Sequence, residues 1–331
     1  MPAAHRRPHK VLPGVNETGD QAPQFKVEQP GVFSAIQDLG RPGRRIAGVP
    51  PGGAMDRFAL AAANLLVGNP AGAAALECAL TGPTLEILDR CVLAVTGADF
   101  EPTLNGRAVP GWTGLFCAPG DRLSFGGRRW GARAYVAVAG GLAADRWLGS
   151  AATYVLIGRG GLQGRPLKRE DVLHRAGSAP RPLVAGRELP QPYRPPYSTE
   201  PELMTVAGPQ LGRIKAAGKR LLFGQPWTVS SDADRMGYRL QGPQLPTTGA
   251  DVVSFGLTSG CIQLPQSGQP ILLMADGQTA GGYPVVGGVA RCDLTLAAQL
   301  LPGESLRFRE TRVETAQAEY RSRWAALDRI R

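Results

Sequence analysis

The sequence predicts a mainly β protein made of two related halves, with a few short helices and one helix at the C-terminus. Short apolar runs alternate with Gly and Pro throughout the 331 residues, and runs bounded in this way are typical of strands and turns. Two kinds of segment also recur in the same order at similar spacing. One is an Asp-Arg step at 56–57 and 234–235, and the other reads Pro-Gly-acid-x-Leu-x-Phe at 119–125 and 302–308. Such internal repetition indicates a duplicated all-β domain.

The first half is expected to span residues 27–196, linker included, after a disordered extension at 1–26. The extension has no apolar core, so we do not interpret it as a secretory signal. A strand and a Gly/Pro turn are predicted at 31–43. A helix follows, with Asp56 as its N-cap and Gly68-Asn69-Pro70 at its end. Strands are predicted at 75–80, 84–88 and 91–95, and a hairpin at 103–109, where Asn105-Gly106 suits a type I′ turn.

The second half is expected to span residues 197–331, after a proline-rich connection at 178–201. Short strands are predicted at 203–206, 252–257, 261–264 and 271–275. From Val313 to Ile330, apolar residues recur every three or four positions, which indicates one amphipathic helix. We expect this helix to pack on the body of the protein or on a partner, and we expect a hetero-oligomer.

Composition excludes several classes of protein. The net charge is +10, but the basic residues are scattered and aromatics amount to only 6%, so we predict no nucleic-acid partner. No apolar run approaches the roughly 18 residues of a membrane span, so we expect a cytoplasmic protein without a membrane contact. The five cysteines form no Cys-x-x-Cys pair and are expected to be buried thiols. Only His174 lies outside the N-terminal extension, which argues against a metal site.

The segment 226–243 is the first candidate site, because it gathers Asp234, Arg235, Tyr238 and Arg239 around a glycine. A core strand would not tolerate these charges, so we expect a loop that lines a polar cleft. Arg235 or Arg239 would hold a carboxylate in a two-pronged hydrogen bond, which Lys cannot reproduce. The alternative is that Asp234 and Arg235 only pair with each other and brace a turn.

The second candidate site is formed by two turns further along the chain. Gln263 and Gln278 offer amide donors and acceptors suited to a lactam or ureido group, and Asp276 adds a carboxylate that we count with the catalytic candidates. Gly281-Gly282 would let the backbone approach a ligand, and Tyr283 would close the site. The alternative is a pair of ordinary turns at strand ends.

A glycine-rich loop at 158–165 is the third candidate. Gly160, Gly161 and Arg165 could present backbone N–H groups and a cation to an anionic cofactor. The loop is not a Walker A sequence, and it opens no helix as a dinucleotide fingerprint would.

Together these segments resemble the biotin-dependent carboxyltransferase family, which includes the C subunit of 5-oxoprolinase, allophanate hydrolase subunit 2 and Kip-antagonist proteins. The resemblance covers about residues 31–308. It is carried by these stretches: Gly-Ala-Met-Asp-Arg-Phe-Ala-Leu at 53–60 with Asn64 to Asn69, Asp-Arg-Met-Gly-Tyr-Arg-Leu at 234–240, Gly-x-Ile-Gln at 260–263, and Gln-Thr-x-Gly-Gly-Tyr-Pro at 278–284.

The resemblance implies two tandem cyclophilin-like β-barrel domains. It implies a subunit of an ATP-dependent complex that acts on an amide or lactam, in some members opening 5-oxo-L-proline to glutamate. The expected partners are the B subunit of 5-oxoprolinase, which is Kip-inhibitor-like, and its A subunit. Two alternatives stay open. One is a carboxyltransferase for a urea-like amide that receives biotin on a separate carrier, and the other is a non-catalytic regulator of a Kip-inhibitor-like protein.

The sequence departs from the family pattern at several positions. The Gly-Ser-Arg-Ser-Thr-Tyr segment reads Gly-Ser-Ala-Ala-Thr-Tyr at 149–154, with Ala151 in place of Arg. Arg159 replaces an aromatic residue, Gly277 replaces an Arg, and Val285 replaces a Lys. Each change removes or moves a charge near the expected ligand, so a different ligand or a reduced activity stays open.

Overall fold

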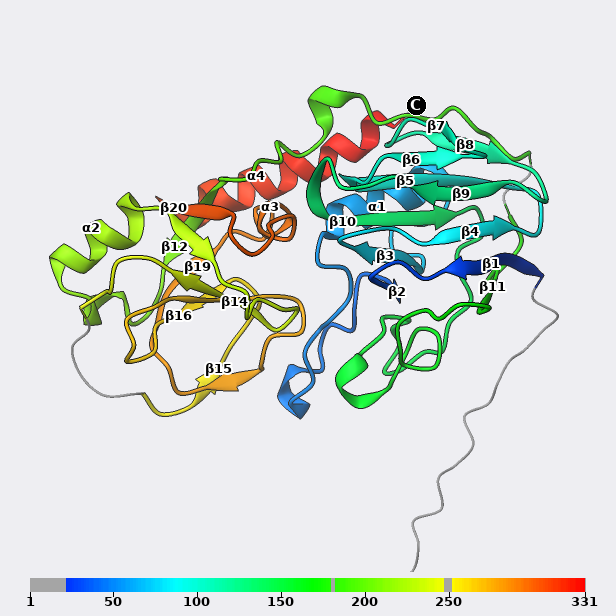
Figure 1. Ribbon diagram of the computed structural model, residues 1–331. Coiled ribbons are helices and arrows are strands. Elements are labelled where there is room, and N and C mark those ends of the chain that lie inside the picture. The colour runs from blue at the N-terminus through cyan, green and yellow to red at the C-terminus, as the bar shows by residue number, and fades with distance from the viewer. Residues whose placement is uncertain (1–21, 180–181, 247–251, 331) are drawn as a thin grey trace, which may run out of the picture.

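The computed structural model describes residues 22–179, 182–246 and 252–330 (Figure 1). Its strands and few helices confirm the mainly β prediction. β1 (Pro23–Gln29) begins inside the predicted extension, which therefore cannot reach residue 26 as expected. Residues 1–21 lie outside the described part of the chain. No helix of the described ranges is both long enough and apolar enough to cross a bilayer.

The first half consists of two sheets around one core (Figure 1). One sheet has the order β11-β1-β4-β9-β6-β7, and the other has the order β2-β3-β10-β5-β8. The remaining strands are β2 (Phe33–Gln37), β3 (Ala75–Ala79), β4 (Thr84–Ile87), β5 (Cys91–Asp99), β6 (Pro102–Leu104), β7 (Arg107–Ala108), β8 (Gly114–Cys117), β9 (Arg122–Phe125), β10 (Trp130–Val138) and β11 (Val172–His174).

Strand β10 shows how the sequence fills both faces of its sheet. Ala134, Val136 and Val138 point into the core between the sheets, because alternate residues of a strand face the same side. Tyr135 and Ala137 face the opposite side, where they pack under helix α1 (Arg57–Leu66). β10 is therefore buried on both faces, and this explains its almost wholly apolar sequence.

The local predictions for the first half are confirmed. Asp56 caps α1, and its Oδ1 accepts a hydrogen bond from the backbone N–H of Ala59 at 2.9 Å. The predicted hairpin joins β6 to β7, and Asn105 and Gly106 take φ angles of 54° and 75°, as a type I′ turn requires. Two short 3-10 helices lie in loops of the two-sheet body, η1 (Arg45–Ala47) and η2 (Val155–Ile157).

The second half is a closed barrel with the order β12-β19-β16-β17-β14-β13-β20. Its strands are β12 (Glu202–Ala207), β13 (Trp227–Val229), β14 (Gly237–Gln241), β16 (Cys261–Gln263), β17 (Ile271–Leu273), β19 (Val285–Val289) and β20 (Ser305–Thr311). β15 (Phe255–Gly256) and β18 (Ala280–Gly281) pair separately. Its helices are η4 (Leu211–Arg213), α2 (Ala216–Gly224) and α3 (Leu294–Ala297).

The proposed correspondence between the two Asp-Arg steps is wrong. Asp56 begins a helix, whereas Asp234 lies in the loop between β13 and β14, and no helix follows it. The second half places its own short helix, α3, directly after the buried Asp293. The dipeptide repeats, but its local structure does not, because a cap needs a helical sequence behind it.

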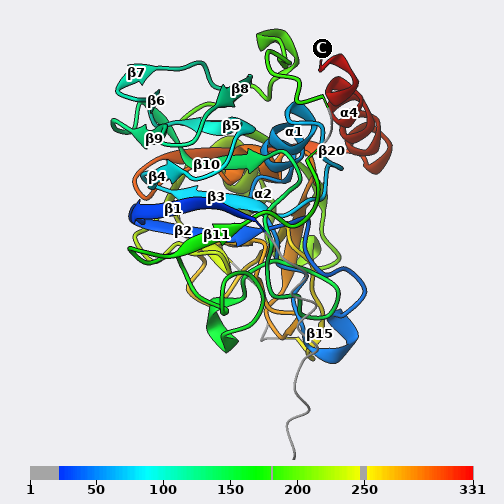
Figure 2. The same cartoon turned by 90° about the vertical axis from the view of Figure 1, so that its right-hand side faces the viewer.

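The C-terminal helix packs on the body of the same chain. α4 (Val313–Ala325) runs from the barrel to the first half and lies beside α1, and η5 (Ala326–Arg329) continues it (Figures 1 and 2). The Trp324 ring meets Phe58 edge-on with 6.4 Å between centroids, and Leu327 is buried in the same cluster. We expected this helix to pack either on the body of the protein or on a partner, and the structure shows it packed on the body.

The proline-rich connection is also held against the body. Its described part contains η3 (Gln191–Tyr193) and the fully buried Leu189. Tyr197 donates its hydroxyl proton to Oδ2 of Asp56 at 2.6 Å, and the side-chain amide of Gln299 donates to the same oxygen at 2.9 Å. Asp56 therefore joins the first helix, the connection and the second half at one carboxylate.

Candidate functional site

A charged cluster lies where the two halves meet. Arg235, in the loop before β14, donates from Nε to Oδ2 of Asp276 at 2.8 Å. One terminal nitrogen of Arg235 donates to Glu77 of the first half, and the other donates to the carbonyl of Gly53 at 2.6 Å. We call Glu77, Arg235 and Asp276 the central cluster. It links the barrel to β3 and to the loop that precedes α1.

Backbone and side chains around Glu77 fix this geometry. β3 and β10 pair so that Glu77 stands opposite Tyr135, whose hydroxyl donates to Oε2 of Glu77 at 2.7 Å. The same oxygen accepts the backbone N–H of Met55 at 2.8 Å. On the barrel side, the backbone N–H of Asp276 donates to the carbonyl of Arg235 at 2.9 Å. The central cluster is therefore held from both halves.

Electrostatics keep Arg235 charged. Burial opposes the positive charge, but the adjacent Asp276 and Glu77 outweigh that effect and raise the pKa of Arg235 above its ordinary value. All three nitrogens of its guanidinium already donate hydrogen bonds, to Asp276, Glu77 and the carbonyl of Gly53. Arg235 therefore has no pair of free N–H groups with which to bind a substrate carboxylate. Within this arrangement Arg235 positions Asp276.

Arg41 lies close to the central cluster and is almost completely buried. One terminal nitrogen donates to the carbonyl of Ala152, and the guanidinium lies over the ring of Trp147 at 5.1 Å. Its Nε and other terminal nitrogen have no hydrogen-bond partner among the described residues. A Cβ at Gly52 would lie 2.7 Å from that nitrogen and 3.2 Å from Oδ1 of Asp276. Gly52 thus leaves room between Arg41 and Asp276.

Three of the predicted catalytic residues lie in other environments. Asp234 is exposed, and its carboxylate accepts the backbone N–H groups of Met236 and Gly237 at 2.8 and 3.0 Å, which closes a tight turn. Tyr238 is buried in the barrel core, where Arg133 donates to its hydroxyl at 3.0 Å. Arg239 follows on β14 and points outward, because neighbouring residues of a strand face opposite sides. The turn-bracing alternative is also corrected, since Arg235 pairs with Asp276 and Glu77 and not with Asp234.

The predicted glutamine pair does come together. Nε2 of Gln278 donates to Oε1 of Gln263 at 3.1 Å. Nε2 of Gln263 is buried and has no partner within the described part of the chain. A Cβ at Gly281 would lie 2.6 Å from Nε2 of Gln278 and 3.1 Å from Nε2 of Gln263, so this glycine keeps the amides accessible. Gly282 lies beside Gly281 and is half-buried, and the Tyr283 side chain is exposed.

The glycine-rich loop has a packing role. A Cβ at Gly160 would lie 2.2 Å from the carbonyl oxygen of Ala152, and one at Gly161 would lie 1.9 Å from Oγ1 of Thr153. Arg165 donates from both terminal nitrogens to Asp171, at 2.7 and 2.9 Å. Gly160 and Gly161 are needed so that the loop can approach Ala152 and Thr153 closely, and Arg165 is already paired with Asp171. These residues do not fit a phosphate-binding loop.

The four departures from the family pattern have different surroundings. Ala151 and Val285 are buried, and Val285 pairs with Gln263 in the barrel. Arg159 is exposed. At Gly277 a Cβ would lie only 3.0 Å from the carbonyl oxygen of Met236. Apolar packing at Ala151 and Val285 and a tight turn at Gly277 thus stand where the family pattern expects a charged side chain, whereas Arg159 places an exposed cation where it expects an aromatic.

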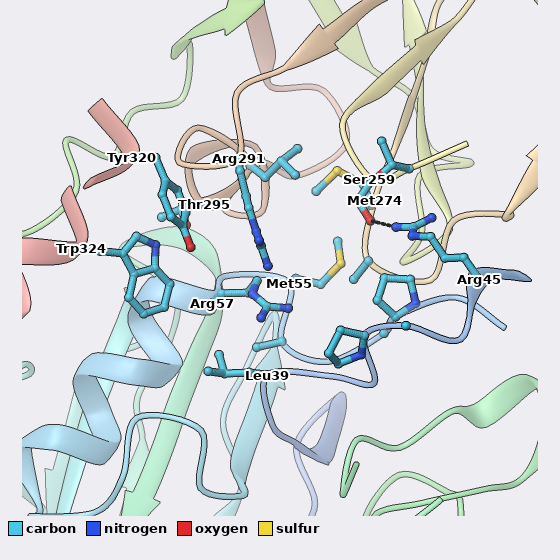
Figure 3. A pocket seen from close by; sticks show the side chains of 18 residues that line it. Leu39, Arg45, Met55, Arg57, Ser259, Met274, Arg291, Thr295, Tyr320 and Trp324 are labelled. Atoms are coloured by element: carbon cyan, nitrogen blue, oxygen red, sulfur yellow. Dashed lines mark hydrogen bonds between the residues drawn. The ribbon is translucent and has the colours of Figure 1, made fainter. Parts of the chain in front are cut away.

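A cavity of about 620 Å³ opens next to the central cluster, between the first half, the barrel and α4 (Figure 3). Its wall includes Gly52, which lies between Arg41 and Asp276, and Ala275, which precedes Asp276 in the chain. The lining residues come from one stretch of the first half, three stretches of the second half and the terminal helix: Leu39, Pro42, Gly43, Arg45, Pro51, Gly52, Ala54, Met55, Arg57, Thr258, Ser259, Met274, Ala275, Arg291, Leu294, Thr295, Tyr320 and Trp324.

Arg45 bridges the two halves at the edge of this cavity. It donates to the carbonyl of Leu257 at 2.7 Å and to Oγ of Ser259 at 3.4 Å. Burial lowers its pKa from the ordinary value. No three His, Cys, Asp or Glu side chains of the described residues are grouped in a way that could hold a metal ion.

Sequence reasoning missed the contribution of the first half. Arg41, Glu77 and the Gly52-Gly53 pair all belong to it, whereas the predicted catalytic and substrate-binding residues all lay in the second half. The Gly-Gly pair just before the Asp56 cap was the available signal, since adjacent glycines often allow close backbone approach. Nothing local marked Glu77, which lies in an apolar strand.

Residues 47–310 match the family described as carboxyltransferase domain, subdomain A and B. The chain is 38% identical to the 5-oxoprolinase C subunit of Escherichia coli (strain K12) over 295 residues, which cover 88% of this chain and 93% of that protein. It is 33% identical to the 5-oxoprolinase C subunit of Haemophilus influenzae over 308 residues, 90% of this chain and 94% of that protein.

Solved structures give the same fold. The crystal structure of K. lactis urea amidolyase superposes with a TM-score of 0.88 at 28% identity and covers 95% of this chain. This chain spans only 20% of that protein. The likeness therefore extends over nearly all of the described fold but concerns one part of a larger enzyme.

Proposed function

This chain belongs to the carboxyltransferase domain family, subdomains A and B, and on that premise we propose that it is the C subunit of a 5-oxoprolinase. The reaction is the ATP-dependent opening of 5-oxo-L-proline to L-glutamate, performed in a cytoplasmic complex with two partners, a Kip-inhibitor-like B subunit plus an A subunit. The single observation that carries the proposal is the similarity over nearly their full length to two proteins named as C subunits of 5-oxoprolinase.

The glutamine pair supports a lactam substrate. A lactam presents a carbonyl acceptor and an N–H donor side by side, and carboxamide side chains complement both. The unpaired Nε2 of Gln263 would donate to the lactam carbonyl, and Gly281 leaves the approach open. An unpaired buried amide is costly for folding, and its persistence favours a binding role.

Asp276 would act from the other side of the same turn. It lies two positions from Gln278, and the gap beside Gly52 separates its Oδ1 from Arg41. The unpaired nitrogens of Arg41 would hold a negatively charged oxygen in that gap. In this proposal Gln263 and Gln278 orient the amide edge, and Arg41 and Asp276 contact its charged or reacting part.

We assign ATP to the partner subunits. The glycine-rich loop is packed against Ala152 and Thr153, and Arg165 is held by Asp171, so the loop does not fit a nucleotide. ATP would supply the driving force for opening the ring within the complex. This chain would supply substrate binding and orientation, and its activity would appear only after assembly.

A second candidate function is carboxyl transfer to a urea-like amide, favoured by the close match to urea amidolyase. Biotin would arrive on a separate carrier, because no Met-Lys attachment pair occurs in this sequence. The unpaired Gln263 amide fits a ureido carbonyl as well as a lactam carbonyl. Carboxylated biotin on that carrier would supply the carboxyl group, and Gln263 would orient the acceptor amide for the transfer.

The deciding experiment is reconstitution with the neighbouring A and B subunits. We expect glutamate to form from 5-oxo-L-proline only when ATP and all three chains are present, with the complex lacking this chain as control. No ATP-dependent glutamate from a folded complex would reject the first function. Incorporation of labelled bicarbonate into an amide, together with a co-purifying biotinyl protein, would establish the second. A complex without any turnover would indicate the regulatory alternative.

A further inference from the structure

Two arginines enter the cavity from opposite halves of the protein. Arg57 is the first residue of α1, and Arg291 follows β19 of the barrel. Figure 3 shows their guanidinium groups pointing toward one another. The cavity wall contains no Asp or Glu, and neither arginine forms an ion pair with a carboxylate of the described residues. Like charges thus meet in a cavity whose described wall offers them no carboxylate.

The nearest carboxylates are already committed elsewhere. Asp56, the chain neighbour of Arg57, is fully buried and accepts hydrogen bonds from Ala59, Tyr197 and Gln299. Asp38 attracts Arg57 electrostatically, but its carboxylate is bound by the hydroxyl of Ser150 and the backbone N–H of Ala151, both at 2.7 Å. Neither acid supplies a direct partner to the arginine pair.

The arginines are held in place without such a partner. Burial, followed by the charge of Arg291, lowers the pKa of Arg57 to about 10. Nε of Arg57 is buried and has no hydrogen-bond partner among the described residues. Arg291 lies over the ring of Tyr320, with 5.7 Å between the guanidinium carbon and the ring centroid. The unpaired Nε and the mutual repulsion are both features that a bound oxyanion would relieve.

The rest of the cavity suits the carbon part of a small molecule. Met55 and Met274 face it from the two halves, and Trp324 covers it from α4 (Figure 3). Thr295 also lines the cavity. A volume of about 620 Å³ lies within the range of small-molecule sites, which are mostly apolar with a few placed polar groups.

We propose that this cavity binds a small organic oxyanion, a carboxylate or a phosphate ester, whose charged group is held by Arg57 and Arg291 and whose carbon part contacts Met55, Met274 and Trp324. This site is distinct from the Gln263 and Gln278 pair and does not depend on the function proposed above. Because both halves and α4 contribute to the wall, an occupant would stabilise their packing against one another.

The test is calorimetric titration of the purified chain with inorganic phosphate, phenyl phosphate and benzoate at constant ionic strength. The variants are Arg57→Gln, Arg291→Gln and the double substitution. Arg107→Gln on the exposed hairpin strand β7 removes the same charge away from the cavity and serves as control. Thermal unfolding without added anion checks that each variant is folded.

We expect saturable binding of at least one organic probe, weakened about tenfold or more by each single substitution and unchanged in the control. Tighter binding of phenyl phosphate than of benzoate would indicate a phosphate ester, and the reverse would indicate a carboxylate. Without anion, the variants should melt at the same temperature as the parent or higher, because the repulsion between the two arginines is relieved.

The proposal is overturned if no organic probe binds saturably, or if the double variant binds as tightly as the parent. It is equally overturned if only inorganic phosphate binds, which would mean an adventitious ion only.

Discussion

Glu77 and Arg235 lie 158 positions apart in the sequence and form a buried ion pair between the two halves of the protein. Asp276 binds the same guanidinium, so one cation holds two carboxylates at the domain boundary. These side-chain contacts, together with the connecting chain, fix how the two halves are placed relative to each other. Because Arg235 is part of this ion pair, its substitution should affect stability and not only ligand binding, unlike substitution of Arg239.

Arg235→Ala should destabilise the fold severely. It leaves Glu77 and Asp276 buried without their counter-ion, and breaking such a pair costs about 3–5 kcal/mol. Arg239→Ala, on the outward face of β14, removes the same charge and should change stability by less than about 0.5 kcal/mol. Urea unfolding of both variants gives the comparison. Equal stabilities would contradict the central cluster.

Gln263→Leu should separate binding from stability. The substitution keeps approximate size and removes the buried, unpaired Nε2. It also removes the hydrogen bond from Gln278, but that side chain is exposed and water can replace the lost partner, so the free energy of unfolding should stay about the same. Activity of the reconstituted complex should fall about tenfold or more, since the amide edge loses its donor. Gln266→Leu, at an exposed position in the turn that follows β16, is the control. Full activity of the Gln263 variant would place the substrate elsewhere.

Asp56→Ala should cost roughly 3 kcal/mol, because it removes the cap of α1 and two further hydrogen bonds, from Tyr197 and Gln299. Asp234→Ala removes only an exposed turn contact and should cost about 1 kcal/mol or less. Thermal unfolding distinguishes them. A Tm of the Asp56 variant within 1–2 °C of the Asp234 variant, on the order expected for a lost surface contact, would refute the three-way junction.

The Arg165–Asp171 pair predicts a pH dependence of stability. The hydrogen bond from Arg165 lowers the pKa of Asp171 below its ordinary value of 3.8. The unfolded chain therefore takes up the proton first as pH falls. The stabilisation is fully present above that value and disappears as pH drops through the lower folded-state pKa. Arg165→Gln should be less stable than the parent at pH 6, and the difference should shrink toward pH 2. A difference that grows with acid would contradict the assignment.

Local signals in the sequence predicted most of the fold. The Asp56 cap and the Asn105-Gly106 turn are decided by a few adjacent residues, and both appear where expected. The Asp234-Arg235 step led to a wrong comparison with Asp56-Arg57, because no helix-forming sequence follows it. The meeting of Arg41, Glu77 and Arg235 could not be predicted, since it depends on how two distant halves dock.

The position of β20 decides when the second half is able to fold during synthesis. This last strand lies between β12 and β13 and pairs in parallel with β12, the first strand of the barrel. The barrel therefore stays open until Thr311 has left the ribosome, whereas all strands of the first half have emerged well before. A nascent chain stopped before residue 305 should carry a folded first half and an uncovered barrel edge, which is a natural substrate for chaperones.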